Sequence, residues 1–284
     1  MVLVQPENQH VTKAFDLTGK VAIVTGKHFA MRTSEIKRVL TECRRIPRHR
    51  PRSLEGSGRS WGKCVAIIYN TSSTAAETAS QIASENKITC RAYQANVTSK
   101  DEVTSTINKI KSDFGRLDIV IANSGIASSV PAEEYTIEEW RKIMDVNLDG
   151  AFWTAQAAAN VFKEQGTGKG SIVFTASVSA SLVNVPQKQA AYNASKAAVV
   201  QLAKCLSVEW VDICRVNCIS PGFIATEILD HHPKEWREKW YDMIPAKRMA
   251  QAYELKGAYV FAASDASSYM TGADIIIDGG YVLP

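Results

Sequence analysis

Short apolar runs alternate with longer segments of helical period along most of the chain. The apolar runs are rich in Val and Ile and mostly lack polar alternation, as in strands buried on both faces. Strands are expected at Val21–Thr25, Val65–Tyr69, Thr89–Gln94, Ile119–Ala122, Ile172–Thr175, Val216–Ile219 and Ile275–Ile277. Helices are expected at Ala75–Ser84, Lys100–Phe114, Ile137–Leu148, Ala191–Val211 and Ala252–Ala263. This alternation predicts an α/β fold with a doubly wound parallel sheet, in which ligands bind beyond the carboxyl ends of the strands.

Residues 27–62 break the alternation. They show no helical period, and the run Arg44–Arg52 combines like charges with two prolines, which stop a helix. Between Lys27 and Lys63 stand eleven Lys or Arg against three Asp or Glu, so this segment accounts for the net charge of +4 and the rest carries about −4. We expect a single domain, residues 1–284, with an aberrant, poorly ordered basic insertion at about 27–62.

Composition excludes several classes of protein. The basic run has no interleaved aromatic residues, so no nucleic-acid partner is expected. The six cysteines include no C-x-x-C pair, which favours free buried thiols over a metal site. No apolar run is long enough for a signal peptide or a membrane span. We therefore expect a cytoplasmic protein without bound metal or membrane contact.

Candidate chemistry lies in the segment Tyr192-Asn193-Ala194-Ser195-Lys196, on an expected helix. Residues four apart share a helix face, so the lysine ammonium can lie beside the phenol. A phenol with its ordinary pKa of about 10 is a poor acid or base at neutral pH, and a neighbouring cation lowers that pKa. Ser177 precedes Tyr192 by fifteen residues, just after an expected strand.

Further polar and glycine-rich elements fall at the ends of other expected strands. Asn123-Ser124-Gly125 follows the fourth strand, Asn147 lies near the end of the next helix, and Pro221-Gly222-Phe223-Ile224-Ala225-Thr226 follows the sixth strand. In this order, with the tyrosine and lysine, they resemble the short-chain dehydrogenase/reductase family. The resemblance runs from about Leu17 to the C-terminus, apart from the insertion. It implies a Rossmann-type fold and a hydride transfer between a nicotinamide cofactor and a carbonyl or alcohol carbon.

The resemblance also implies a role for each catalytic residue. Tyr192 would donate or accept the substrate proton, while Lys196 would lower the pKa of Tyr192 and bind the nicotinamide ribose. Ser177 would hydrogen-bond the carbonyl oxygen, and Asn147 would hold a water. Ser179 is a rival to Ser177, which we prefer because it follows the strand directly. Each residue also has an ordinary structural reading: a strand-end cap for Ser177, a helix C-cap for Asn147, a solvated face for Lys196.

The end of the second strand indicates the choice of cofactor. Enzymes that use NAD place an acidic residue there for the ribose 2′-hydroxyl, whereas this chain has Tyr69-Asn70-Thr71-Ser72, which favours NADP(H). Asn96-Val97 stands where the family usually has Asp-Val beside the adenine. By resemblance, the cofactor-binding residues are Gly26, Tyr69, Asn70, Asn96, Val97, Asn123, Gly125, Tyr192, Lys196, Pro221, Gly222, Ile224 and Thr226.

The chain departs from the family at the first turn. Gly26 opens the T-G-x-x-x-G-x-G loop, whose glycines let backbone N–H groups approach the pyrophosphate. Lys27-His28-Phe29-Ala30-Met31 follows without the other two glycines, and Gly56-Ser57-Gly58 lies too far downstream to replace them. We hypothesise a splicing or gene-model error over residues 27–62. The alternative function is therefore a catalytically impaired or inactive isoform that lacks the pyrophosphate-binding loop.

The substrate class rests on resemblance alone. Residues 122–127, 210–226 and 254–281 are similar to fungal NADP-dependent mannitol dehydrogenases and sorbose or xylulose reductases, which interconvert ketoses and polyols. Polar side chains that suit a hydroxylated substrate are Asn184, Gln187, Gln189 and His231, although plain surface polarity explains them equally well. The family commonly forms tetramers through the helix that carries Tyr192, which implies a homo-oligomer, a tetramer or a dimer.

Overall fold

A seven-stranded, entirely parallel sheet forms the centre of the computed structural model, which describes residues 3–4, 6, 9–26, 64–225 and 233–283. Its strands are β1 (Val21–Thr25), β2 (Cys64–Tyr69), β3 (Thr89–Gln94), β4 (Ile119–Ala122), β5 (Gly170–Thr175), β6 (Cys214–Pro221) and β9 (Asp274–Ile277). Their order is β3-β2-β1-β4-β5-β6-β9. The winding reverses between β1 and β4, where doubly wound sheets bind ligands. This confirms the predicted fold class.

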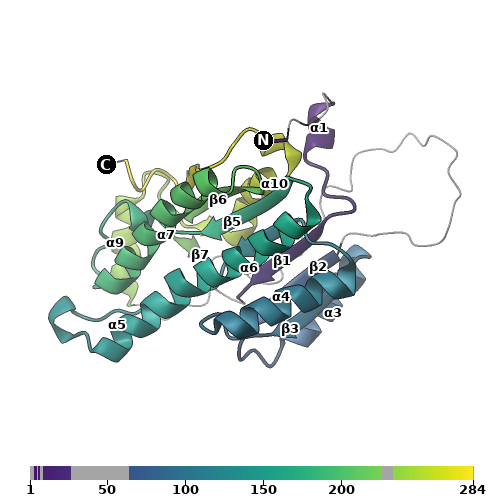
Figure 1. The fold of residues 1–284 in the computed structure, drawn as a ribbon. Coiled ribbons are helices and arrows are strands. Elements are labelled where there is room, and N and C mark those ends of the chain that lie inside the picture. Colours follow the sequence, from purple (N-terminus) through teal and green to yellow (C-terminus); the bar gives the residue numbers. More distant parts are fainter. Residues whose placement is uncertain (1–2, 5, 7–8, 27–63, 226–232, 284) are drawn as a thin grey trace, which may run out of the picture.

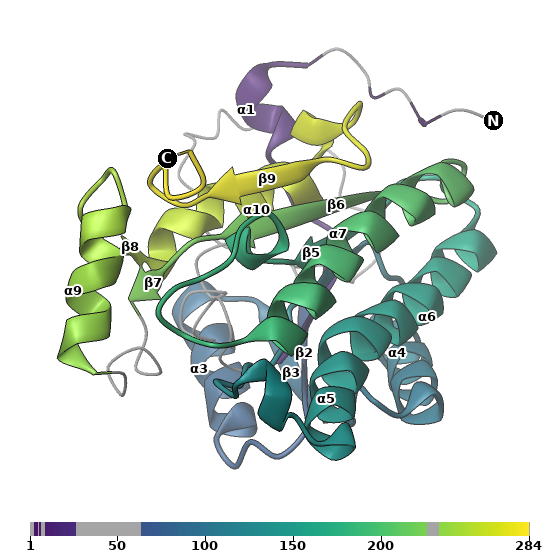
Figure 2. The ribbon, with the colours of Figure 1, turned by 90° about the vertical axis from the view of Figure 1, so that its left-hand side faces the viewer.

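Helices cover both faces of the sheet (Figures 1 and 2). They are α1 (Val11–Ala14), α3 (Ala75–Asn86), α4 (Lys100–Phe114), α5 (Ile137–Met144), α6 (Gly150–Gln165), α7 (Ala190–Glu209), α9 (Lys234–Met243) and α10 (Lys256–Ala263). Alternate residues of β1 divide between the two layers: Val21 and Ile23 pack with α4, α6 and α7, and Ala22 and Val24 pack with α10. Strand β1 is therefore apolar on both faces, as its sequence predicted.

Local sequence explains where the outer helices begin and end. The Ser99 hydroxyl accepts a hydrogen bond from the Glu102 amide at the start of α4, and Gly115 ends that helix in the left-handed region at φ +80°. At the start of α5, Thr136 and Glu139 form a reciprocal capping box. These two helices begin where the sequence predicted.

The helical track that begins with α5 is longer than the sequence predicted. A helix was expected over Ile137–Leu148, but a π-helical turn at Asp145–Asp149 continues directly into α6. Gly150, the first residue of α6, packs closely on Val97, and a Cβ there would lie 2.9 Å from the Val97 side chain. The expectation that Asn147 lies near a helix end, as a C-cap, is therefore wrong: it lies inside a continuous helical track.

Some sequence expectations fall outside the described residues. They are the basic insertion at about 27–62, with Lys27–Met31 and Gly56–Gly58, and the site candidates Thr226 and His231. Among the residues that the structure does describe, no helix has both the length and the apolar character needed to cross a membrane. The same residues contain no group of three or more His, Cys, Asp or Glu side chains that could hold a metal ion.

Candidate active site

The carboxyl ends of β1, β4, β5 and β6 bring the candidate residues to one edge of the sheet. Gly26, Asn123 and Ser177 follow β1, β4 and β5, while Pro221 ends β6. Figure 2 looks onto the side of the molecule that carries this edge, with α7 crossing in front of β5 and β6. Parallel strands in register explain the convergence, because every strand ends at the same edge.

Asn123 ties β4 to β1 beside Gly26. Its backbone and side-chain N–H groups donate to the Thr25 hydroxyl and carbonyl at 3.1 and 3.3 Å. Its side-chain Oδ1 is buried and accepts no hydrogen bond in the part of the chain that the structure describes. Gly26 has a φ of +80°, and a Cβ there would lie 2.8 Å from the Ser124 Cα, so only glycine fits.

Helix α7 carries the tyrosine and lysine, both buried. The Lys196 Nζ lies 5.7 Å from the centre of the Tyr192 ring and donates to the Thr175 carbonyl at the end of β5, at 2.7 Å. The Tyr192 side chain is hydrogen-bonded to that of Ser177. The plain reading of Lys196 as a solvated side chain is wrong, because its exposed fraction is 0%.

Burial dominates the ionisation of this pair. Loss of solvent raises the pKa of the Tyr192 phenol above its ordinary value. Loss of solvent also lowers the pKa of Lys196 to about 8. The ammonium lies over the ring and is bonded to Thr175, and its expected depression of the phenol pKa stays a prediction. Because burial raises the pKa of Tyr192, the phenol is neutral at pH 7.

Ser177 and Ser179 are both buried and bonded to each other. The Ser177 Oγ lies 3.1 Å from the Ser179 Oγ and accepts from the Ser179 amide at 3.2 Å. The Ser177 side chain is bonded to Tyr192, whereas the Ser179 hydroxyl donates to Asn184 at 2.6 Å. Of the two serines, Ser177 is the one whose side chain meets the phenol.

The π-helical turn directs Asn147 into the molecule. Its Oδ1 accepts from the Ile126 amide at 2.8 Å, and its Nδ2 donates to the Ile126 carbonyl and to the Ser195 hydroxyl, both at 3.0 Å. Asn147 thus links the segment after β4 to α7, next to Tyr192 and Lys196. A single π turn inside an α-helix is common at functional sites because it redirects one side chain.

Residues at the ends of β2 and β3 form the other end of the site. The Asn70 carbonyl accepts from Gln94, and no carboxylate follows Tyr69 on this strand. Asn96 is committed locally, since its Oδ1 accepts from the Thr98 amide and its own amide donates to Glu102. The Ser72 hydroxyl is buried and has no partner in the described part of the chain, which leaves a donor free at this end.

Beyond β6, Gly222 and Ile224, which were expected to bind the cofactor, pack against other parts of the protein. A Cβ on Gly222 would lie 2.8 Å from the Asp278 Cα, so glycine is needed for the approach of the C-terminal segment. Ile224 begins β7 (Ile224–Ala225), which pairs with β8 (Ala250–Gln251) outside the main sheet. Ile224 is buried in the core layer with α10.

An aromatic cluster beside the site was missed by the sequence analysis. Trp240 of α9 stacks on Phe223 with ring centres 4.6 Å apart, and Tyr281 meets Phe223 at 5.3 Å. The Trp240 indole donates to Gln187 at 3.0 Å and to the Val185 carbonyl at 3.2 Å, so α9 holds the segment that follows β5. The signal available in the sequence was Trp236 and Trp240, spaced four apart in a charged segment.

Comparisons with known proteins agree with this geometry. The family model described as enoyl-(acyl carrier protein) reductase matches residues 59–282. A probable NADP-dependent mannitol dehydrogenase of Yarrowia lipolytica is 41% identical over 98% of this chain and 92% of its own length. An L-xylulose reductase of Hypocrea jecorina is 48% identical over 78% of this chain and 83% of its own length. The crystal structure of an NADPH-dependent 3-quinuclidinone reductase from Rhodotorula rubra aligns with a TM-score of 0.84 at 36% identity, covering 99% of this chain and 98% of that one.

Proposed function

The chain belongs to the short-chain dehydrogenase/reductase family, and we propose that it interconverts ketoses and polyols with NADP(H) as the cofactor. The observation that carries this proposal is the meeting of Ser177, Tyr192 and Lys196 at the carboxyl edge of the sheet. The same edge carries an acceptor on Asn123 that has no partner among the described residues. The sugar class is supported by the relatives, which are named as mannitol dehydrogenase and xylulose reductase. Their names give no support to the alternative of an impaired isoform.

The cofactor is NADP(H). This expectation is confirmed by relatives and by a solved structure that are named for NADP or NADPH. The end of β2 agrees with it, because no carboxylate there would repel a 2′-phosphate, and the buried Ser72 hydroxyl, which has no partner among the described residues, would supply a donor. Tyr69, Asn70, Asn96 and Val97 would hold the adenosine end.

The other end of the site suits the nicotinamide half of the cofactor. The Asn123 Oδ1 is a buried acceptor with no partner among the described residues, and Gly26, which packs closely on Ser124, would face the pyrophosphate. Gly125, Lys196, Pro221 and Ile224 would complete this half, with Gly222 contributing through the turn after β6. When bound, the cofactor supplies or removes the hydride at the substrate carbon.

The side chains of the site manage the substrate proton. Because burial keeps Tyr192 neutral at pH 7, its hydroxyl can donate a proton to the carbonyl oxygen of a ketose during reduction. Ser177 lies against that hydroxyl and would contact the same oxygen. Lys196 lies beneath the ring and would bring positive charge to the ribose and the phenol. Asn147 keeps α7 and the segment after β4 in place, and its expected water stays a prediction.

The test is a panel of ketoses assayed with NADPH. We expect turnover with fructose, sorbose or xylulose and its loss by at least about a hundredfold in Tyr192→Phe, since general acid catalysis contributes that much or more. Binding of NADPH to Tyr192→Phe should persist, because only one hydroxyl is removed. An active Tyr192→Phe protein would refute the role of Tyr192, and activity with simple ketones but no ketose would refute the substrate class.

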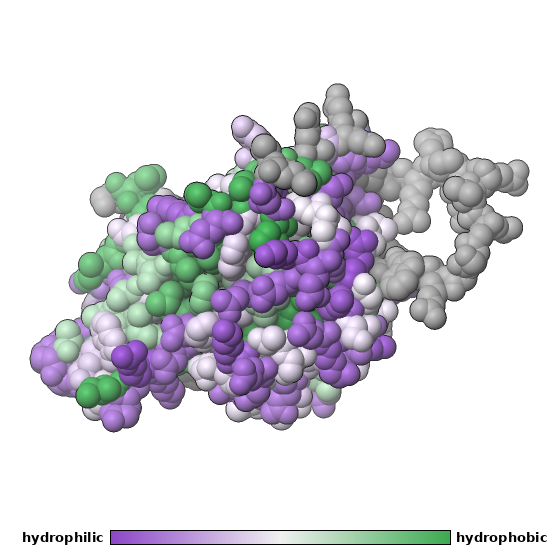
Figure 3. Space-filling view, in the orientation of Figure 1, coloured by the Kyte–Doolittle hydropathy of each residue, from purple (hydrophilic) through white to green (hydrophobic). Residues whose placement is uncertain are grey.

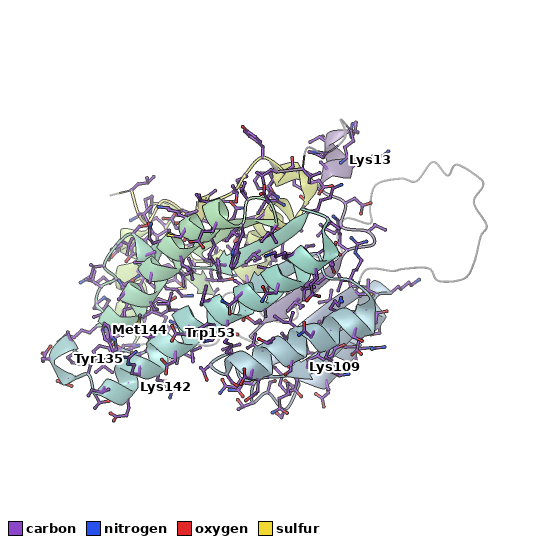
Figure 4. The ribbon with its side chains drawn as sticks, in the orientation of Figure 1. Lys13, Lys109, Tyr135, Lys142, Met144 and Trp153 are labelled. Atoms are coloured by element: carbon purple, nitrogen blue, oxygen red, sulfur yellow. The ribbon has the colours of Figure 1, made fainter. Side chains whose placement is uncertain are left out.

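The side of the molecule formed by α6 and α7 supports an oligomer of identical chains. Figure 3 shows hydrophobic residues gathered over α7 and the adjoining part of α6, and Figure 4 shows that Met144 and Trp153 come from α5 and α6 on this side. Trp153 is only partly buried, and the centre of its ring lies 5.0 Å from that of Phe152. Mass photometry should show dissociation in Ala197→Arg, on α7, and none in Ala76→Arg, on α3.

A further inference from the structure

A chain of hydrogen bonds leads from a backbone carbonyl to Ser177. The Asn193 Nδ2 donates to the Leu182 carbonyl at 3.0 Å. The Asn193 Oδ1 accepts from the Gln189 Nε2 at 3.0 Å, and the same Nε2 donates to the Asn184 Oδ1 at 2.8 Å. Asn184 then accepts from the Ser179 hydroxyl, which lies 3.1 Å from that of Ser177. The chain thus crosses from α7 through the segment after β5 to the site.

The direction of every bond in this chain follows from its first member. A backbone carbonyl can only accept, so Asn193 must turn its amide nitrogen to Leu182 and its oxygen to Gln189. Gln189 must then present its NH2 group, which has two hydrogens, one for Asn193 and one for Asn184. The longer approach of the same nitrogen to the Ser179 Oγ, at 3.4 Å, is compatible with this arrangement.

The same reasoning determines where the serine hydrogens point. The Asn184 Oδ1 cannot donate, so the single hydrogen of Ser179 is used on Asn184. Ser179 can therefore only accept from Ser177, and the single hydrogen of Ser177 points to Ser179. The lone pairs of Ser177 are left for the Ser179 amide and for the Tyr192 hydroxyl, which must donate to it.

We propose that Asn193, Gln189, Asn184 and Ser179 are positioning residues that fix the direction of the Ser177 hydroxyl, so that Ser177 accepts a hydrogen bond from Tyr192. The chain keeps the Tyr192 proton on the phenol and directed at Ser177, where the substrate oxygen would arrive. This inference rests on the proposed function for its catalytic meaning. The direction of these hydrogen bonds can be measured in the protein without cofactor or substrate.

Two nearly isosteric variants each add one negative charge, but only one of them reverses the direction of the hydrogen bonds between Gln189 and Ser177. In Asn184→Asp the carboxylate accepts from both Gln189 and Ser179, so the direction is kept. In Gln189→Glu the NH2 group is lost, and Asn184 must turn its own NH2 toward the new carboxylate and Ser179. The hydrogen of Ser179 then goes to Ser177, and the hydrogen of Ser177 becomes available to the Tyr192 oxygen.

The readout is the titration of Tyr192, followed through the ¹³Cζ signal of labelled tyrosine and assigned with Tyr192→Phe. A donor to the phenol oxygen lowers its pKa, whereas a nearby negative charge raises it. We expect the midpoint of Gln189→Glu to fall by at least about half a pH unit and that of Asn184→Asp to stay or rise. The neighbouring titratable groups are Lys196 on α7, Cys218 on β6 and Tyr281, whose side chain meets that of Asn184, and all three are unchanged in both variants.

A third variant covers the case in which Gln189→Glu does not fold. Ser179→Ala adds no charge and removes the acceptor of Ser177, so it should also lower the Tyr192 midpoint. Titrations run up to the pH at which the far-ultraviolet circular dichroism changes. The inference is overturned if the folded variants, Gln189→Glu or Ser179→Ala, titrate at or above the wild-type midpoint, or not at all in that range.

Kinetics with ketoses then connect the wiring to turnover. The alkaline limb of the kcat profile for reduction should move to lower pH in Gln189→Glu and not in Asn184→Asp, with little change in KM. A protein that turns over no ketose would refute the proposed function, while the tyrosine midpoints would still decide the wiring. If the alkaline limb moved equally in Gln189→Glu and Asn184→Asp, the cause would be the added charge, and the inference would be overturned.

Discussion

At the scale of single residues, the site depends on groups whose burial opposes their charge. Lys196 has no exposed surface, and its ammonium donates to the Thr175 carbonyl at 2.7 Å. Lys side chains are rarely buried this fully. The lowered pKa of Lys196 measures this cost, which the fold bears to keep a cation beneath Tyr192.

Lys196→Met should show that cost as a change in the pH dependence of stability. The pKa of Lys196 falls from 10.5 to about 8 on folding. Between these values the unfolded chain binds more protons than the folded one, so this group makes the wild type more stable as pH rises, by up to about 3 kcal/mol. Chemical denaturation at pH 7 and pH 10 should reveal that rise.

The variant should lack the rise between pH 8 and pH 10.5 and should lose NADPH turnover. At pH 7 its stability should stay within about 2 kcal/mol of the wild type, because removal of the buried charge offsets the loss of the bond to Thr175. The difference between the two proteins isolates Lys196 from other titrating groups. If the difference in free energy of unfolding between the wild type and Lys196→Met were the same at pH 7 and pH 10, the lowered pKa of Lys196 would be contradicted.

Tyr69→Asp should change the preference for cofactor. A carboxylate at the end of β2 would repel a 2′-phosphate and could bond a 2′-hydroxyl. The repulsion between two charges near a protein surface is about a few kcal/mol before screening by salt. We expect the ratio of kcat/KM for NADPH to that for NADH to fall by at least about tenfold. Tyr69→Asn, which has similar size and no charge, is the control and should leave the ratio within about threefold.

At the scale of elements, the sequence was sufficient where a segment ends at clear local signals. Strands β1, β3 and β4 and helix α4 were predicted to the residue, because each is bounded by turn residues or by a cap. Strand β5 begins two residues earlier than expected, and β6 extends two residues further at both ends, since residues such as Gly170 and Cys214 continue the ladder. Ladder bonds at strand ends depend on the partner strand, which a local pattern does not contain.

Two parts of the site could not be read from the sequence for a different reason. The π turn at Asp145–Asp149 is set by packing: Asn147 bonds Ile126 and Ser195, residues far away in the chain. The chain of amides from Asn193 to Ser179 likewise exists only once α7 and the segment after β5 are folded together. The residues Tyr192, Lys196 and Ser177 carry their own signal in spacing, whereas the groups that orient them do not.

At the amino end of β6, the buried side chain of Arg215 stabilises the fold. The Arg215 guanidinium is buried and donates to the carbonyls of Ala262 and Ser264, at 3.1 and 3.0 Å, and to the Ser267 hydroxyl at 2.8 Å. Burial lowers its pKa to about 10. These bonds connect β6 to the end of α10, at the edge of the sheet opposite to the site.

Arg215→Met should therefore destabilise the fold without changing catalysis. The buried carbonyls would lose their charged donor, which costs more than removal of the buried cation returns, and we expect a net loss of about 2–4 kcal/mol. Arg91→Met is the control, since Arg91 is half exposed and its ion pair with Asp113 is long, at 3.8 Å. Denaturant midpoints measure stability, and an altered KM for ketose in Arg215→Met would contradict the separation of the two edges.

At the scale of the whole molecule, chemistry and stability occupy opposite edges of one sheet. Among the described residues, the carboxyl edge carries polar atoms without a partner on Asn123 and Ser72. At the amino edge Arg215 and Asp118 are bonded: Asp118 accepts from the Val21 amide at 2.9 Å and is paired with Arg116. The family match begins at residue 59 and leaves the first strand and the segment after it outside. What this sheet edge lacks in sequence is the rest of the glycine loop after Gly26.

Replacement of residues 27–62 by a glycine-rich loop and a helix of ordinary length should strengthen cofactor binding. A pyrophosphate needs converging backbone donors at close approach, which glycine permits and which His28, Phe29 and Met31 obstruct as residue types. The basic side chains of the segment can attract phosphate, but long charged side chains lose rotamer entropy when they are ordered and give less geometric selection than converging backbone donors. We expect the replacement to bind NADPH at least about tenfold more tightly by calorimetry.

A second replacement of the same length, with alanine at the two added glycines, separates the effect of the loop from that of chain length. It should fold as well as the glycine version and bind NADPH about as weakly as the chain with residues 27–62. Tight binding by the unmodified chain would refute this prediction and, with it, the impaired isoform. Weak binding by the glycine version would instead refute the account of the cofactor site built on Gly26 and Asn123, because every other residue of that site is shared by the three proteins.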